Sequence, residues 1–348
     1  MANQVIISTN IQQTLAEAIG KVKHDKLFLL ADETTFQLCL PLVMDIPHIQ
    51  NATRIVIGAT DTHKTLDTLS HVWSELSNGG GTRHSLMVNL GGGMVTDLGG
   101  FAASTFKRGI PYINVPTTLL SMVDASVGGK TGINFNGLKN EIGVFNAPDT
   151  VILDTEFLKT LDHENILSGY AEMLKHGLIS NDQNFAELLN FDLDNVDYPH
   201  LGQMVGTSVA IKERIVEEDP LEHGIRKALN LGHTAGHAFE SWALSRRPVL
   251  HGYAVAWGLI CELYLSCIKT GFPTDKMRQT VRFIKENYGT LPITCDDYEE
   301  LHQYMTHDKK NTAGIINFTL LGDIGDIRIN QTATKEEIFE MLDFFREG

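Results

Sequence analysis

Two histidines four residues apart have the types and the spacing of a possible metal site. In the stretch "LNLGHTAGHAFE", residues 229–240, His233 and His237 would project from one face of a helix. Imidazoles are frequent zinc ligands, but a zinc-protease helix has glutamate directly after its first histidine, where this chain has Thr234. A zinc protease is thereby excluded. The pair could still be a two-histidine metal clamp, half of one, or two packed histidines near a glycine turn.

Other candidate metal ligands lie in two further segments. "GYAEMLKHG" carries Glu172 and Lys175 three residues apart, and "VLHGYAVAWG" carries His251 at the start of a helical pattern. One carboxylate and two histidines would make a three-ligand zinc site with a position left open for a substrate. An ordinary surface ion pair remains the alternative for Glu172 and Lys175, and a structural role remains the alternative for each histidine.

The residues before His233 add polar side chains at helical spacing. In "HGIRKALNLGHTAGHAFE", Arg226, Asn230, His233 and His237 follow one another at intervals of four, three and four residues. If the stretch is helical, these side chains share one continuous face. Several polar residues on one face of an otherwise apolar helix favour a binding or catalytic role.

A glycine-rich turn with charged residues nearby could bind a phosphate. The turn lies in "VNLGGGMVTDLGGF", between a strand-like and a helical run, and consists of Gly91, Gly92 and Gly93. Backbone N–H groups can approach a phosphate closely there, although Thr96 replaces the third glycine of the dinucleotide-binding pattern. Asp61 and Lys64, in "ATDTHK", could meet ribose hydroxyls and phosphate. A merely tight turn and an exposed turn remain the alternatives.

Residues 115–145, "VPTTLLSMVDASVGGKTGINFNGLKNEIGVF", are a second candidate anion site. Asp124, Lys130 and Lys139 accompany five glycines in an otherwise apolar region. Lys130 follows a Gly-Gly pair, an arrangement that favours anion binding by backbone and ammonium together. Solvated surface remains the alternative.

The elements that must position these residues change character near residue 160. Before it, short apolar runs alternate with helical patterns such as "TLAEAIGKV" and "KTLDTLSHVWSELSN"; the runs are "QVIIS", "KLFLLAD", "RIVIGA", "SLMVNLG", "YINVPTT" and "TVILD". This rhythm predicts an α/β domain over residues 1–160, with a largely parallel, Rossmann-like sheet.

After residue 160 helical periodicity dominates, and residues 161–348 are predicted to form a mainly helical domain. The helical patterns cover residues 163–180, 201–219, 229–243, 252–269 and 275–288. Only "INFTLL", near the end, is typical of a strand. A cleft between the two domains is the expected place for the active site.

Composition limits the classes of partner. The chain has 348 residues, enough for two domains, and its net charge of −15 excludes nucleic acid and anionic membrane, though a local lysine cluster could still bind a phosphorylated substrate. Four cysteines without framework spacing indicate free thiols in a reducing cytoplasm. The first residues lack the pattern of a secretion signal, and Glu262 interrupts the longest apolar stretch, so no membrane span is expected.

Taken in order, these motifs resemble the 3-dehydroquinate synthase family of the sugar-phosphate cyclase superfamily, from about Asp61 to Lys310. The motifs are the triple glycine with Asp97, "FKRG" with Arg108, "PTTLLSMVDASVGGKTGIN", "LKNEIG", "AEMLKHG", "RKALNLGHTAGHAFE", "HG" and "MTHDKKN". Two positions depart from the family: Tyr253 stands where glutamate is usual after "HG", and Asp219-Pro220 stands in place of "DE". Neither departure falls on a residue to which the resemblance assigns a role.

The resemblance implies a role for each matching residue. NAD would be bound by Asp61, Lys64, Gly91, Gly92, Gly93, Asp97, Thr117, Thr118, Lys130, Lys139, Phe157 and Thr160. Zinc or cobalt would be held by Glu172, His233 and His251. The substrate's phosphate would be held by Lys130, Asn140, His237 and Lys309, with Arg108 from the other subunit of a homodimer. Arg226 with Lys212 would hold its carboxylate, and Asp124, Lys175 and Asn230 its ring hydroxyls. Lys175, His237, Asp124 and Lys212 are the implied catalytic residues.

The implied reaction converts 3-deoxy-D-arabino-heptulosonate 7-phosphate to 3-dehydroquinate and phosphate, in the shikimate pathway of aromatic amino acid biosynthesis. It proceeds by transient oxidation with NAD, phosphate elimination, re-reduction and intramolecular aldol closure. One rival is a cyclase acting on sedoheptulose phosphate or a hexose phosphate, which would not need a carboxylate-binding arginine. A second is a metal- and NAD-dependent polyol dehydrogenase, which would release NADH. A third is a non-catalytic sensor, against which the full set of metal ligands argues.

Overall fold

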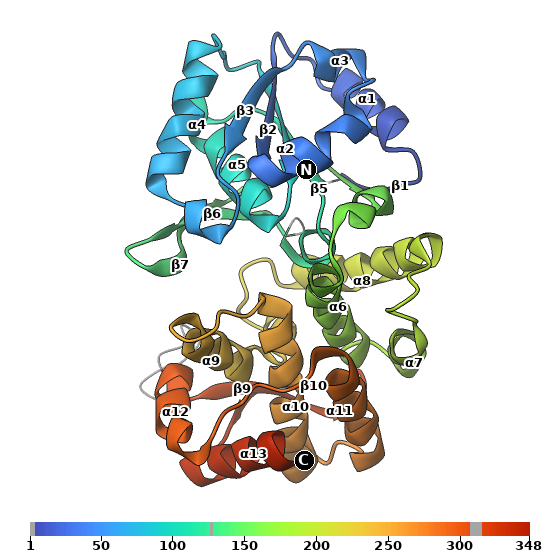
Figure 1. Ribbon diagram of the computed structural model, residues 1–348, viewed down its shortest axis with the longest axis vertical. Helices are drawn as coiled ribbons and strands as arrows, with labels where there is room; N and C mark the ends of the chain where they lie inside the picture. Colours follow the sequence, from blue (N-terminus) through green and yellow to red (C-terminus); the bar gives the residue numbers. More distant parts are fainter. Residues whose placement is uncertain (1–3, 126–127, 307–314) are drawn as a thin grey trace. The chain divides into compact units, whose positions relative to one another are not determined.

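The structure is a computed structural model that describes residues 4–125, 128–306 and 315–348. It divides into two compact units, which are drawn in Figure 1. The first unit runs to Asp162 and also includes Asp197–Val209. The second comprises His163–Val196 and the chain from Ala210 onward.

The first unit is built on a six-stranded sheet in the order β1-β8-β5-β4-β2-β3, and every pairing in it is parallel. The strands are β1 (Gln4–Ser8), β2 (Leu27–Asp32), β3 (Thr53–Ile57), β4 (Leu86–Gly91), β5 (Tyr112–Pro116) and β8 (Thr150–Asp154). The four inner strands are buried at every residue, as is typical of parallel strands covered on both faces. The predicted parallel α/β sheet is confirmed.

Helices pack on this sheet, and the strand order separates neighbouring loops at one point along its C-terminal edge. They are α1 (Ile11–Lys21), α2 (Glu33–Leu38), α3 (Pro47–Gln50), α4 (Leu66–Asn78) and α5 (Gly93–Thr105). Phe28 and Leu30 of β2 join Leu69 and Leu98 of the helices in one hydrophobic core. Because β3 and β4 lie on opposite sides of β2, the loops at the strand C-termini diverge there, as at the ligand-binding edge of open α/β sheets.

A hairpin beside α5 was not predicted. It consists of β6 (Lys130–Phe135) and β7 (Leu138–Phe145), which pair antiparallel. Asn136 and Gly137 form the two-residue turn with φ of 50° and 80°, which is the positive-φ geometry that Asn-Gly favours. The sequence signal was therefore present in "FNGL", but the stretch lacks the apolar alternation of a strand.

The second unit is mainly helical, as predicted. Its helices are α6 (His163–Leu178), α7 (Asp182–Asn190), the later part of α8 (Tyr198–Glu218), α9 (His233–Leu244), α10 (His251–Thr270), α11 (Thr274–Tyr288), α12 (Tyr298–Thr306) and α13 (Lys335–Glu347). "INFTLL" gives β9 (Asn317–Asp323), which pairs antiparallel with β10 (Asp326–Thr332). None of the helices in the described ranges is long and apolar enough to cross a membrane.

The expected continuous helix through residues 229–243 is wrong. A 3-10 helix, η6 (Ile225–Asn230), ends before Leu231, and α9 begins only at His233. Between them Gly232 has a φ of 80°, a left-handed conformation that interrupts the helical hydrogen-bond ladder and suits glycine. Arg226 and Asn230 therefore do not share a helix with His233.

Candidate active site

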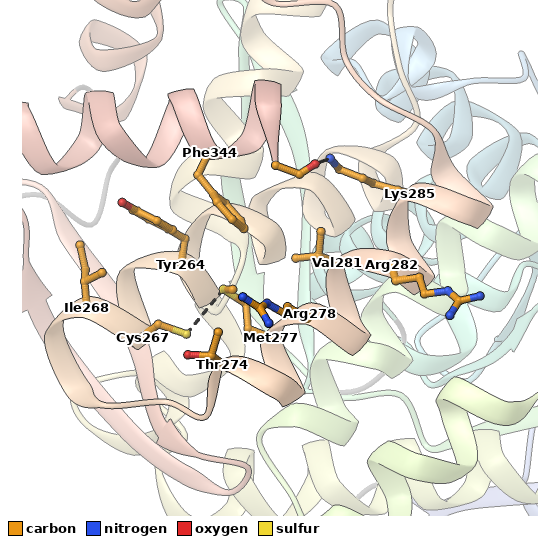
Figure 2. Close-up of a pocket in the computed structure, with 11 residues that line it drawn as sticks. Tyr264, Cys267, Ile268, Thr274, Met277, Arg278, Val281, Arg282, Lys285 and Phe344 are labelled. Atoms are coloured by element: carbon orange, nitrogen blue, oxygen red, sulfur yellow. Dashed lines mark hydrogen bonds between the residues drawn. The ribbon is translucent and has the colours of Figure 1, made fainter.

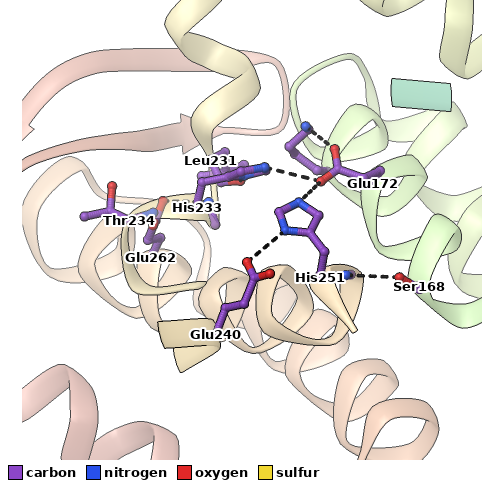
Figure 3. Close-up of polar contacts among 11 residues, drawn as sticks. Ser168, Glu172, Leu231, His233, Thr234, Glu240, His251 and Glu262 are labelled. Carbon is purple, nitrogen blue, oxygen red and sulfur yellow. Dashed lines mark hydrogen bonds and ion pairs between the residues drawn. The ribbon is translucent and has the colours of Figure 1, made fainter. Parts of the chain in front are cut away.

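Three side chains of the second unit form a compact cluster of metal-binding type. Glu172 comes from α6, while His233 and His251 are the first residues of α9 and α10. Figure 3 shows the two imidazoles converging on the carboxylate, and the three potential ligand atoms lie within 4.8 Å of one another. His233 Nε2 is 3.3 Å and His251 Nε2 is 3.6 Å from the same oxygen, Glu172 Oε1.

A glycine allows α6 and α10 to approach closely enough to form this cluster. A Cβ on Gly252 would lie 1.8 Å from the Ser168 carbonyl oxygen, so only glycine fits there. The Gly252 N–H instead donates to Ser168 Oγ at 3.1 Å. Because Glu172 lies about one turn beyond Ser168 and His251 directly precedes Gly252, this crossing brings the carboxylate and the imidazole together.

The two carboxylate oxygens of Glu172 have different surroundings. Its side chain is fully buried, and Oε2 accepts a hydrogen bond from the equally buried Lys175 ammonium. Burial alone would raise the pKa of Glu172, but Lys175 and His233 outweigh it and hold the pKa well below its usual value. Among the described residues, Oε1 has no hydrogen-bond partner. A buried, ionised oxygen facing two imidazole nitrogens fits a divalent cation such as zinc or cobalt.

Both imidazoles are oriented through their other nitrogen. His233 Nδ1 lies 3.1 Å from the Leu231 carbonyl oxygen, and His251 Nδ1 lies 3.2 Å from Glu240 Oε2. Such contacts fix the tautomer and leave Nε2 available to a metal. Burial lowers the pKa of His251, but its contacts with Glu172 and Glu240 raise it overall to about 10.

Glu240 was missed by the sequence reasoning, although it is the last residue of the motif quoted first. It supports His251 from α9, so the support of this histidine does not depend on the residue at position 253. The Tyr253 ring instead joins an aromatic group, with its centroid 6.0 Å from Trp257 and 5.2 Å from Tyr288.

His237 lies beside the cluster. Its ring centroid is 5.3 Å from that of His233 and 6.0 Å from that of His251. In the described part of the chain, the ligand group comprises Glu172 and the other two histidines without His237. The expectation that His237 contacts substrate instead of metal stays a prediction.

The residues expected at the substrate carboxylate lie on η6 and α8 of the same unit. Arg226 is 4% exposed, and its Nη1 donates to the Pro220 carbonyl oxygen at 2.6 Å. Asp219 accepts N–H groups of His223, Gly224 and Arg226, which closes the loop around its carboxylate. Asp219 and the backbone carbonyl of Pro220 therefore hold Arg226 in place.

Asn230 and Lys212, which are also expected to bind the substrate, lie in the same unit. Asn230 Nδ2 donates to Glu222 Oε1 at 3.1 Å. Lys212, on α8, is 6% exposed. A buried ammonium at this position is consistent with a role that needs a desolvated charge.

Charged residues expected to bind NAD gather in the first unit. Lys64 is 4% exposed and donates to Asp97 Oδ2 at 2.5 Å and to Asn140 Oδ1. Burial raises the pKa of Asp97, and pairing with Lys64 only partly offsets this. Asp61 accepts from Asn134 of β6 at 3.0 Å. The unpredicted hairpin thus supplies partners to both Asp61 and Lys64.

The glycine turn lies at the C-terminal edge of the sheet. β4 ends at Gly91, α5 begins at Gly93, and the Thr117 N–H donates to the Gly91 carbonyl oxygen at 3.0 Å. A Cβ on Gly91 would meet the Val95 side chain at 2.6 Å. The Thr118 hydroxyl donates to Ser121 Oγ at 2.9 Å. The strand-turn-helix context expected of a phosphate-binding turn is present.

The remaining predicted residues have varied surroundings. Phe157 is fully buried in the first unit, and the Thr160 hydroxyl donates to its carbonyl oxygen at 2.7 Å. Lys130 and Lys139 are exposed on the hairpin, and Asp124 lies on a π-helical turn, Ser121–Ala125. Lys309 lies outside the described residues.

A separate hollow in the second unit holds none of the residues expected to bind metal, NAD or substrate. Figure 2 shows it between α10, α11 and α13, with a volume of about 590 Å³ and walls that include Tyr264, Met277, Val281 and Phe344. Its lining is mostly apolar. We assign it no part in the candidate active site.

The comparisons with known proteins agree with this architecture. Residues 54–168 match the family described as 3-dehydroquinate synthase N-terminal, and residues 169–311 match 3-dehydroquinate synthase C-terminal. The chain is 58% identical to the 3-dehydroquinate synthase of Parabacteroides distasonis over 346 residues, which is 99% of this chain and 98% of that protein.

Solved structures define the class. The structure of 2-deoxy-scyllo-inosose synthase with carbaglucose-6-phosphate, NAD⁺ and Co²⁺ has a TM-score of 0.85 at 22% identity, covering 99% of this chain and 96% of that one. The 2-epi-5-epi-valiolone synthase of Streptomyces hygroscopicus, with NAD⁺ and Zn²⁺ bound, gives 0.84 at 25% identity, covering 100% and 97%. The fold is that of the sugar-phosphate cyclases. Within that class, the chain belongs to the 3-dehydroquinate synthase family.

Proposed function

We propose that this chain catalyses the 3-dehydroquinate synthase reaction, converting 3-deoxy-D-arabino-heptulosonate 7-phosphate to 3-dehydroquinate and inorganic phosphate. The observation that carries this proposal is the near full-length identity of 58% to a 3-dehydroquinate synthase. The Glu172, His233 and His251 cluster supplies the chemistry that such a reaction needs.

Each unit has its own part in this proposal. Residues 1–160 bind NAD at the carboxyl edge of the parallel sheet, and the helical domain over residues 161–348 holds the divalent metal through Glu172, His233 and His251. When bound, NAD accepts and then returns a hydride, and the metal polarises the substrate oxygens beside the oxidised carbon.

The chain's own residues position the substrate and move its protons. The buried guanidinium of Arg226, with Lys212, binds the carboxylate, and Asp124, Lys175 and Asn230 bind ring hydroxyls. Lys175 is held against Glu172 with 1% exposure, so its ammonium has a fixed position next to the metal ligands. His237, Lys130, Asn140, Lys309 and the other subunit's arginine at position 108 bind the phosphate. An imidazole there can hold or deliver the proton that the departing phosphate takes.

The assay that tests this function follows phosphate release with NAD present in far less than the substrate concentration. We expect phosphate to accumulate well beyond the amount of NAD while the NADH absorbance stays at its baseline, because each hydride is returned within the same turnover. A chelator should stop the reaction, and added Zn²⁺ or Co²⁺ should restore it. Sedoheptulose 7-phosphate, which lacks the carboxylate, serves as the control substrate.

Two results of this assay would contradict the proposal. NADH that grows in step with turnover would support a polyol dehydrogenase. Equal use of sedoheptulose 7-phosphate would support a cyclase of different specificity.

We also propose a homodimer in which Arg108 acts in the site of the other subunit, and a cytoplasmic location, which the free thiols of all four cysteines suit. Arg108 is exposed at the end of a short 3-10 turn, and among the described residues it makes no hydrogen bond or ion pair. Lys107, Arg108 and Gly109 have successive φ values of 49°, 72° and 113°. Strained backbone of this kind is typical of functional positions.

Mixing two inactive chains tests the position of Arg108. Arg108→Ala and Lys175→Met are each expected to be nearly inactive, but their heterodimer should contain one site with both residues intact. Random exchange should then recover about a quarter of the wild-type activity, since half the dimers are mixed and half of their sites are whole. If subunit exchange is shown by differently tagged chains and no activity returns, Arg108 does not act across subunits.

A further inference from the structure

The carboxylate of Glu262 occupies the place of a helix N-cap at the start of α9. Glu262 belongs to α10 and is fully buried. Its Oε2 accepts the Gly232 N–H at 2.6 Å, and its Oε1 accepts the N–H groups of Thr234 at 2.9 Å and Ala235 at 3.3 Å. The N-cap residue itself is Gly232, which has no side chain to offer. Glu262 therefore satisfies the N–H groups that an N-cap side chain would ordinarily bind.

His233 lies between the backbone groups that Glu262 holds. It is the first residue of α9, preceded by Gly232 and followed by Thr234, and both of these donate to the carboxylate. The carbonyl of Leu231, one residue earlier, contacts His233 Nδ1 at 3.1 Å. The direction of the His233 ring thus depends on a backbone segment that is fixed by Glu262, and Figure 3 shows both residues at this end of α9.

Close packing ties the same segment to α10. A Cβ on Gly258 would lie 1.9 Å from the Gly232 carbonyl oxygen and 2.7 Å from the Gly236 nitrogen, so the two helix backbones meet without side chains between them. α10 begins with His251, which faces Glu172. Helix α10 therefore carries His251 itself and, through Glu262, fixes the backbone on which His233 lies.

We propose that Glu262 is a positioning residue of the metal centre: its carboxylate holds the first turn of α9 so that His233 Nε2 points at the ion shared with Glu172 and His251. The inference rests on the proposed function of that cluster as the metal site. It adds a dependence of metal affinity on a side chain that contacts neither metal nor substrate. Outer contacts that orient a ligand typically change metal affinity by about 10- to 100-fold when they are removed.

The test compares Glu262→Gln with Ser266→Ala in the full-length chain. The amide of Glu262→Gln keeps the shape but sets an NH₂ group against backbone N–H donors. Ser266 is also fully buried and lies one turn further along α10. Its hydroxyl accepts the Leu321 N–H from β9 at 3.0 Å and donates to the backbone carbonyl oxygen of Glu262 at 2.7 Å, but among the described residues it makes no hydrogen bond to α9 and leaves the Glu262 carboxylate unchanged. It is a matched control for loss of a buried polar contact on the same helix.

The measurements are Co²⁺ affinity by chelator competition, the visible absorption spectrum of bound Co²⁺, and the Tm of the metal-free chain. Glu262→Gln is expected to bind Co²⁺ about 10- to 100-fold more weakly with an altered spectrum. Ser266→Ala should lower the Tm while its affinity and spectrum stay those of the wild type. If Glu262→Gln does not fold, Glu262→Asp is measured in its place. Its shorter side chain keeps the negative charge but moves it away from the N–H groups of α9, and we expect the same weaker Co²⁺ binding and altered spectrum.

His233→Ala separates failure of this inference from failure of the proposed metal site. If His233→Ala loses Co²⁺ while the Glu262 variants keep wild-type affinity and spectrum and lose only Tm, Glu262 has a purely structural role and the inference is wrong. If His233→Ala also keeps its Co²⁺, the metal site itself is wrong and the inference falls with it.

Discussion

His233→Ala is expected to lose both the bound metal and all measurable turnover, whereas His237→Ala should keep close to one metal ion per chain and still turn over poorly. The two histidines are four residues apart in sequence and their rings are 5.3 Å apart, so they make a closely matched pair of substitutions. The expected contrast assigns one to the metal and the other to the substrate.

The physical reason is the number of ligands that a catalytic metal requires. Three protein ligands with an open position suit a zinc ion that must polarise substrate oxygens. In the proposed metal site Glu172, His233 and His251 supply these three, and their potential ligand atoms lie within 4.8 Å of one another. A fourth protein ligand from His237 would close the position that the substrate needs.

We expect His237 to contact the phosphate instead, because it follows His233 by one helical turn, about 5.4 Å along α9. From there an imidazole can hydrogen-bond the leaving group and hold its proton. Removal of such a proton-transfer group typically costs about 100-fold or more in rate.

Metal analysis of the two purified variants, with their Tm values as a check of folding, decides the matter. Equal loss of metal from both variants would make His237 a ligand. Full metal with normal turnover in His237→Ala would remove it from the site altogether.

The parts of the fold that the sequence predicted are those with strong local patterns. β2, β4, β5 and β8 are unbroken apolar runs because both faces of each strand are covered. The β6–β7 hairpin was missed because it is rich in glycine and exposes every residue of β7, although its Asn-Gly turn was a usable signal. α13 was also missed, although Thr334 and Glu337 form a capping box at its start.

The candidate active site likewise has features that the sequence predicted and features that it did not. The three residues of the proposed metal site, which the structure brings together, could be named from their types and their order in the family's motifs. Glu262 could not be given a role, because its effect on α9 depends on how two helices cross, and in the sequence it only interrupts an apolar run. The break at Gly232 was missed for a related reason: a regular spacing of polar residues does not reveal that one glycine between them has a positive φ.

Arg226→Ala should lower kcat/KM for the heptulosonate by about 100-fold or more while leaving the Kd of NAD unchanged. Within the described part of the chain, the guanidinium makes one hydrogen bond, to the Pro220 carbonyl oxygen, and it is 4% exposed. Its remaining N–H groups are thus available in a site with little water, where a bidentate contact to a carboxylate is strong. Truncation would leave the substrate carboxylate unpaired in that site, and this desolvation penalty accounts for the size of the loss.

Two further substitutions make the result specific to the guanidinium. Arg226→Lys keeps the positive charge but loses the planar guanidinium that can bind a carboxylate through two hydrogen bonds. Its kcat/KM is expected to lie between those of the wild type and Arg226→Ala. Lys227→Ala removes the same charge from the next residue, whose ammonium contacts Asn330 at 2.9 Å, and should leave kcat/KM near its wild-type value. Arg226→Ala with near-normal kcat/KM would refute carboxylate recognition by this residue. A parallel fall in NAD affinity would instead mean that the substitution disturbs more than substrate binding.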